Sequence, residues 1–258
     1  MTTLCLRLKP LTPLTFIMAA GLALSTGIAI AACDDPPAPK VVWKGCDKQG
    51  IDLSGIDLRG AVLDRTNLEK ANLSGTNLRG AYLGKANLRG ANLTKAKLIE
   101  ATLVGADLSG ADLSNALLLG ARLERTKFIK AQLPNARLDK SNGYDAVFLG
   151  ANLKQAILSD AKMELANFDN ADLSDADLSR AVLSRASMEG TNLQGATLNK
   201  AKLDNTFLVS ADFSFTDLSS ATLVNAETIG ASFEGALLSY TTWVDRKRCR
   251  SGSVGVCR

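Results

Sequence analysis

The chain has 258 residues, of which 46% are hydrophobic but only 5% aromatic, and it contains no histidine. Apolar content supplied by small and aliphatic side chains indicates a thin, regular core and excludes a bulky globular one. A formal net charge of +4 argues against both a strongly acidic mimic of DNA and a nucleic-acid binder with a dense basic stripe.

Residues 1–32 have the layout of a secretory signal. Arg7 and Lys9 precede an uncharged, mostly apolar run over residues 11–32 that ends in small residues, as signal peptides do. An uncleaved membrane anchor is the alternative, because the run is long enough to span a bilayer. Removing Arg7 and Lys9 from the 30 basic residues leaves 28 against 26 acidic ones, a net charge of +2 for the mature chain.

Two cleavage sites compete at the end of this leader. The segment Ile30-Ala31-Ala32-Cys33 resembles the lipobox of bacterial lipoproteins, in which the cysteine is lipidated and becomes the new N-terminus. Cleavage after Ala31 by the A-x-A rule would instead release a soluble protein. We favour lipidation of Cys33, with the Pro-rich residues 34–40 as a spacer. The expected location is the cell envelope, facing the periplasm, with membrane contact only through the lipid or an uncleaved leader.

Residues 33–50 are expected to form the tether and the N-terminal cap of the domain that comes after them. They contain a second cysteine, Cys46. Cys46 can pair with Cys33 only if Cys33 carries no lipid, and the alternative is a buried free thiol.

Residues 51–245 divide into 39 units of five residues with no slip in register. The third position is Leu in 29 units and Phe in five, and the first position is Ala in 29. A period of five scatters Leu around an α-helix, at about 140° per unit, and it sends successive Leu to opposite faces of a strand. We therefore expect short extended pieces with the first and third side chains inward, separated by turns at the fourth and fifth positions.

The bulky rings indicate how many units close one coil. Phe128, Phe148 and Phe168 are spaced by 20 residues, as are Phe213 and Phe233. Four units per coil would place each set in one interior column, ring on ring, which suits aromatic pairs. The expected result is a four-sided solenoid of about 9 to 10 coils at strand spacing.

The units resemble those of the pentapeptide repeat family, whose consensus is A(D/N)LXX, as in ANLRG at residues 86–90 and ADLSD at residues 171–175. The resemblance implies an all-β fold, a right-handed quadrilateral β-helix. The best-known members of the family are cytoplasmic, acidic DNA mimics that occupy a type II topoisomerase. The leader and the mature charge of +2 make that role the less favoured one here.

Residues 246–258 are expected to form a C-terminal cap. Cys249 and Cys257 flank a flexible stretch that is rich in Gly and Ser. Export permits disulfides, so we expect these two cysteines to pair and to close a small loop.

Outward positions that depart from Asn, Asp, Ser and Gly are the candidates for a partner surface. Leu117 and Leu119 are expected on one face, and Ile129 and Leu149 on a neighbouring one. Such apolar positions can bind a partner or a second copy, and the alternative is scattered surface residues of no consequence. The partner would be an unidentified protein, or a second copy bound through the apolar face or the end of the rod.

A further irregularity lies at Gly143, which replaces an inward Leu within the sequence Asn142-Gly143-Tyr144. Asn-Gly is a strong turn signal. A bulge or small loop that projects Tyr144 is one interpretation, and a tolerated packing defect is the other.

Enzymatic chemistry finds little support. Without histidine there is no Ser-His or Cys-His pair and no imidazole metal ligand, and the sequence has no phosphate-binding Gly motif and no CxxC. We expect no catalytic, cofactor or metal residues and no nucleic-acid partner. The predicted function is a non-enzymatic structural or protein-interaction scaffold, with a secreted effector or a carbohydrate- or surface-binding protein as alternatives.

Overall fold

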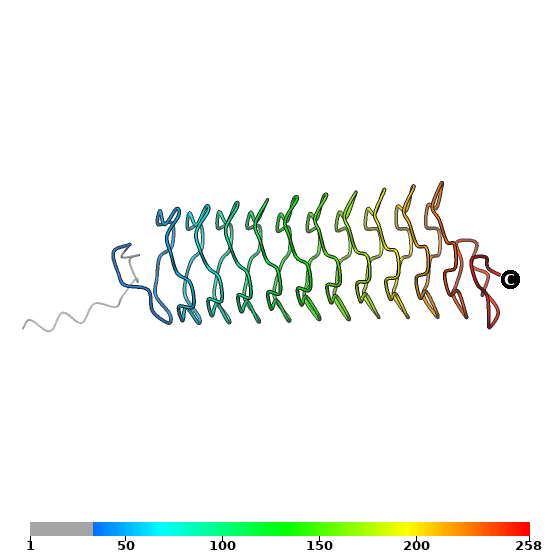
Figure 1. Ribbon diagram of the computed structural model, residues 1–258, viewed down its shortest axis with the longest axis horizontal. Helices are drawn as coiled ribbons and strands as arrows, with labels where there is room; N and C mark the ends of the chain where they lie inside the picture. Colours follow the sequence, from blue (N-terminus) through cyan, green and yellow to red (C-terminus); the bar gives the residue numbers. More distant parts are fainter. Residues whose placement is uncertain (1–32) are drawn as a thin grey trace, which may run out of the picture. The chain divides into compact units, whose positions relative to one another are not determined.

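A computed structural model describes residues 33–258 of the chain, which form a stack of similar coils (Figure 1). The leader and the predicted cleavage after Ala31 lie outside the described residues. Within residues 33–258 there is no helix and no extended strand, and each five-residue unit contributes one isolated β-bridge and a two-residue turn after it. Over the same residues, no helix has the length and apolar character needed to cross a membrane.

The bridges define the coil. Each second-position residue pairs in parallel with the residue 20 positions later, from Val42 with Val62 to Thr222 with Thr242. Four units therefore make one coil, and the coil has four faces. The bridges begin at Val42, ahead of the first complete unit at Ile51.

Two of the four faces differ most from each other in their second-position residues. The groove face carries second-position residues 42, 62 and so on to 242, and the Asx face carries residues 52, 72 and so on to 232. Because four units succeed one another around each coil, these two faces lie on opposite sides.

The core is a set of columns along the axis. Inward Leu and Ala side chains of the repeat are almost completely buried. Phe128, Phe148 and Phe168 stack with ring centroids 4.7 Å apart, and Phe213 stacks on Phe233 at 5.1 Å. The parallel bridges hold residues 20 positions apart next to one another, so the columns result from the 20-residue period. The expectation of an all-β solenoid is confirmed.

The corners explain the fifth position. Residues there have a left-handed backbone, with φ of 62° at Gly90 and 57° at Lys95. Glycine adopts this conformation without strain, whereas other L-residues do so at a cost. The turn therefore favours the frequent Gly and Asn at the fifth position.

Of the two interpretations of Gly143, the bulge is wrong. Asn142 bridges to Lys162 in regular register, and the Gly143 N–H donates to the Lys162 carbonyl at 2.7 Å. A Cβ at Gly143 would collide with the Sδ of Met163, one coil later in the same column. The flexible Met163 side chain occupies the space of the missing leucine, so the coil needs no distortion.

The N-terminal cap contradicts the expected lipidation of Cys33. Cys33 forms a disulfide with Cys46, which is buried, and one sulfur cannot carry both this bond and a lipid. Cys46 is therefore not a free thiol. Residues 34–40 are not a free spacer either, because the Trp43 indole donates to the Asp35 carbonyl at 3.1 Å and the Lys40 N–H to the Arg59 carbonyl at 2.9 Å.

The C-terminal segment folds back over the last coil. Cys249 and Cys257 are joined by a disulfide. Val254 and Arg248 form antiparallel bridges with Leu237 and Thr242 respectively. These contacts cover the edges of two faces of the last coil, where unpaired backbone groups would otherwise invite association.

Candidate functional site

The polar groups of the Asx face satisfy one another. The Asp52 carboxylate accepts a hydrogen bond from the Ser54 N–H at 2.9 Å, and the Asn72 side-chain amide donates to Asp52 at 3.0 Å. The same pattern recurs at Asp172, which accepts from the Ser174 N–H at 3.0 Å and from Asn192 at 3.1 Å. Side chains occupied in this way leave little for a ligand to bind.

The groove face is built differently. Most of its second positions are not Asn or Asp, as at Val62, Tyr82 and Thr102. An acidic group lies instead at some fourth positions and caps the next coil, as Asp64 does by accepting from the Gly84 N–H at 3.1 Å. Three hollows of about 540, 460 and 340 Å³ lie along this face. The groove face is therefore the irregular and hollowed side of the rod.

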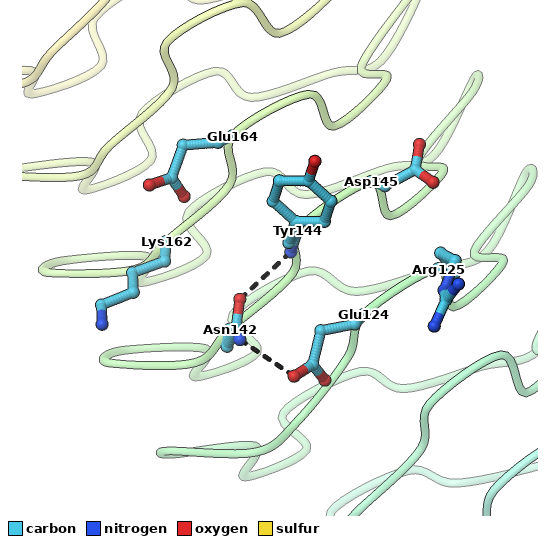
Figure 2. Close-up of a pocket in the computed structure, with 7 residues that line it drawn as sticks. All are labelled: Glu124, Arg125, Asn142, Tyr144, Asp145, Lys162 and Glu164. Atoms are coloured by element: carbon cyan, nitrogen blue, oxygen red, sulfur yellow. Dashed lines mark hydrogen bonds between the residues drawn. The ribbon is translucent and has the colours of Figure 1, made fainter.

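The central hollow surrounds Tyr144, whose side chain is 48% exposed. Figure 2 shows Asn142 between two neighbours: its amide donates to Glu124 Oε1 at 2.9 Å, and its Oδ1 accepts from the Tyr144 N–H at 3.2 Å. Arg122 also donates to Glu124 Oε1, at 3.3 Å. These bonds fix the floor of the hollow. The hollow has a volume of about 460 Å³ and is also lined by Glu164.

One oxygen in this hollow has no partner among the described residues. Glu124 Oε2 is buried without a hydrogen bond, although the whole side chain retains 17% exposure. A buried carboxylate oxygen costs free energy unless a donor reaches it. The hollow is therefore suited to a ligand that brings an N–H or O–H group to Glu124.

A second hollow adjoins the first, since Tyr144 and Glu164 line both. Its apolar contribution is Leu165, which is 40% exposed and has a φ of 60°. A left-handed backbone is unfavourable for a Leu residue, and this side chain is only partly buried in return. Tyr144 and Leu165 together give this part of the groove face an apolar centre with charged groups around it.

The predicted partner residues are not brought together. Leu117 and Leu119 lie on one face, Ile129 and Leu149 on the opposite one, and Tyr144 lies on the groove face between them. The expectation that the two leucine-bearing faces are neighbours is wrong, because two units separate them in every coil. Leu149 and Tyr144 are exposed, whereas the other three are partly buried.

Glu124, Glu164 and Leu165 were not among the predicted site residues. The signal that would have found them is the 20-residue period itself, applied to the outward positions. At that spacing, Asn142 is the one Asn or Asp among the second positions of the groove face within residues 33–258, whereas each other face has several. No group of three His, Cys, Asp or Glu side chains within residues 33–258 is placed to hold a metal ion.

Comparisons with known proteins agree with this architecture. The family model for pentapeptide repeats matches in eight copies, over residues 45–80, 71–110, 106–142, 146–185 and 176–214. No curated protein matches the chain.

Among solved structures, HetL of the cyanobacterium Nostoc, a pentapeptide repeat protein involved in heterocyst differentiation regulation, is 31% identical. The match covers 80% of this chain and 92% of HetL, with a TM-score of 0.54. A pentapeptide repeat protein of the Arabidopsis thaliana thylakoid lumen is 33% identical, over 38% of this chain and 65% of that one, with a TM-score of 0.32.

Proposed function

Because the chain belongs to the pentapeptide repeat family, we propose that it is an exported, non-enzymatic binding rod whose groove face holds a protein partner around Tyr144 and Leu165. In this proposal residues 51–245 form a right-handed, four-sided β-helix of about 9 to 10 coils. Residues 33–50 and 246–258 cap its ends.

The observation that carries the proposal is the contrast between opposite faces. The Asx face satisfies its own polar groups, whereas the groove face keeps an unpaired Glu124 oxygen beside the exposed Tyr144 and Leu165. Unsatisfied polar groups that persist beside a surface hollow point to a binding role. Tyr is also enriched where protein surfaces meet.

Two disulfides support export, because such bonds persist in oxidising compartments and are rare in the bacterial cytoplasm. Together with the bond between Cys33 and Cys46, the leader of residues 1–32 favours cleavage after Ala31 and a soluble, periplasm-facing protein. Intact mass spectrometry of the protein from the envelope fraction tests this directly. We expect an unlipidated chain that begins at Ala32, and a diacylglycerol adduct on Cys33 would overturn this part of the proposal.

Partner binding is tested by affinity capture from a periplasmic extract. The wild-type protein is compared with Tyr144→Ser and with Gln194→Ser, which changes an exposed fourth-position residue on the Asx face. We expect a protein that is retained by the wild type and by Gln194→Ser and lost from Tyr144→Ser. Equal retention by all three would contradict a role for the groove face.

A DNA-mimicking role is less favoured. Such a role requires a continuous acidic surface, whereas one edge of the groove face carries Arg65, Arg125 and Arg185 without an ion pair to any described residue.

A further inference from the structure

The arginines of the repeat fall into two groups. The first group is ion-paired to Asp or Glu and consists of Arg59, Arg79, Arg89, Arg122, Arg137 and Arg180. The second group, Arg65, Arg125 and Arg185, has no such pair within residues 33–258. All three share the fifth position at one corner of the coil, which is an edge of the groove face. Their positive charge is therefore left available along one line.

Positively charged side chains gather at the N-terminal end of the groove face. The hollow of about 540 Å³ there is lined by Lys44, Arg65, Lys85 and Arg122, with Asp64 as its carboxylate. Asp64 is already occupied by the Gly84 N–H, at 3.1 Å. Arg122 is paired with Glu124, which leaves Lys44, Arg65 and Lys85 against Asp64. The local charge is therefore positive, although the mature chain as a whole is close to neutral.

The floor of this hollow offers a hydrogen-bond donor. Where the second position is Asn or Asp, its side chain can accept from the fourth-position N–H, as Asp52 does from Ser54, but the second position before Val104 is Thr102. Within residues 33–258 the Val104 N–H has no protein acceptor. Gly84, one coil earlier, has no side chain to cover it. An oxygen acceptor of a ligand can therefore reach backbone as well as side-chain donors.

An aromatic ring completes the surface. Tyr82 lies on the same face, two positions before Gly84, and its side chain is 51% exposed. A tyrosine ring presents an apolar face that packs on other flat surfaces and a polar hydroxyl that hydrogen-bonds. The pyranose rings of sugars have such an apolar surface, and their acidic forms carry carboxylates.

We propose that this N-terminal part of the groove face binds an acidic polysaccharide, with uronate carboxylates on Arg65, Lys85 and Lys44 and a sugar ring on Tyr82. A chain ligand fits better than a small molecule, because the cations lie along the rod axis at strand spacing, about 4.8 Å per coil. The two sites share Arg122, which donates to Glu124 in the Tyr144 hollow. Arg65, Lys85 and Tyr82 do not line that hollow, so variants of these residues test this proposal independently of the first.

The test measures binding of a fluorescently labelled oligogalacturonate to the full mature protein at low and high salt. The variant Arg65→Gly/Lys85→Gly removes both charges at positions with a left-handed backbone. Glycine is accommodated at this corner, because Gly105 occupies the same position one coil after Lys85. We expect this variant to bind at least about tenfold more weakly, as loss of two charge-assisted contacts implies. Tyr82→Thr is expected to weaken binding without changing its salt dependence.

The matched control is Lys95→Gly/Lys130→Gly, which has the same net charge and the same backbone positions on other corners. We expect its affinity to stay within about twofold of the wild type, since distant exposed charges are screened. Equal losses in the two double variants would overturn the site in favour of diffuse charge attraction. Equal binding of a neutral dextran, or of single-stranded DNA with the same dependence on Arg65 and Lys85, would also overturn it.

Discussion

Gly143 and Met163 act as one packing unit. The inward third positions of the repeat hold large apolar side chains almost throughout, and the absence of one at Gly143 is offset by the Met163 side chain in the next coil. The unbranched, flexible Met side chain is suited to fill an irregular gap. The sequence reveals Gly143 as an exception, but its compensation becomes visible only when residues 20 apart are known to be neighbours.

We predict that Met163→Ala is unusually destabilising. The cavity it leaves merges with the empty position at Gly143, and the cost of a core truncation grows with the residual cavity, within about 2 to 5 kcal/mol for Met to Ala. The control is Met188→Ala, whose column neighbours are Phe168 and Leu208. Urea unfolding should place Met163→Ala below Met188→Ala by about 1 kcal/mol or more. Equal losses would refute the shared-space explanation.

Leu165, unlike Met163, has no packing role in the core. Its backbone is left-handed, its side chain is exposed, and glycine would suit the position better. The left-handed backbone does not favour a leucine here, and the proposed partner surface with Tyr144 would give Leu165 a role.

We therefore predict that Leu165→Gly stabilises the protein and weakens partner capture. Relief of the left-handed strain should raise the unfolding free energy by about 1 kcal/mol. Lys95→Gly, at φ 57° on another corner, should give a similar gain and leave capture unchanged. If Leu165→Gly retains the partner, then Leu165 has no part in the site.

At the scale of the coil, the repeat alone is sufficient to predict the fold. The period of five excludes regular helix and strand, and the 20-residue spacing of the Phe rings indicates four units per coil. Applied to the outward residues, the same period separates Leu117 from Ile129 by half a coil. The prediction of neighbouring faces for these two residues therefore conflicts with the repeat itself, and they lie on opposite faces.

The end segments could be predicted only in part. The pairing of Cys249 with Cys257 agrees with the flexible stretch between them, whereas the pairing of Cys33 with Cys46 depends on how Trp43 and residues 34–40 fold onto the first coil. Local sequence does not encode that contact. It therefore could not decide between a lipidated and a disulfide-bonded Cys33.

We predict that Cys249→Ser/Cys257→Ser loosens the C-terminal end without unfolding the centre. Opening this short loop removes about 2 to 3 kcal/mol of constraint, and the segment then no longer holds its bridges to Leu237 and Thr242. Hydrogen–deuterium exchange should become faster over residues 236–257 and remain unchanged over residues 128–168. Uniformly faster exchange would show that the cap stabilises the whole stack.

For the whole molecule, the absence of histidine has a simple consequence: no side chain with an ordinary pKa between 5 and 8 is present. At lower pH the carboxylates matter. Burial is the largest influence on the pKa of Asp107 and would raise it, but hydrogen bonds from Ser109 and the nearby Arg89 outweigh burial and lower this pKa. Hydrogen bonds from Arg180 likewise lower the pKa of Asp160.

A lowered pKa in the folded state contributes stability above the unfolded pKa of about 3.9, and this contribution is lost as pH falls through the folded pKa. We predict an unfolding free energy that is constant from about pH 5 to 8 and that decreases below about pH 4. Urea titrations across this range test it. A change in stability between pH 6 and 7 would show that some group titrates there and that these pKa assignments are incomplete.

The central claim is that the rod binds its protein partner through the groove face and not through the opposite Asx face. The most direct measurement replaces Tyr144 or Gln194, both exposed fourth-position residues, with a photo-crosslinking amino acid and irradiates living cells. We predict a discrete crosslinked product from position 144, lost when Leu165→Gly is added, and none from position 194. Crosslinking from position 194 alone, or equally from both positions, would contradict the claim.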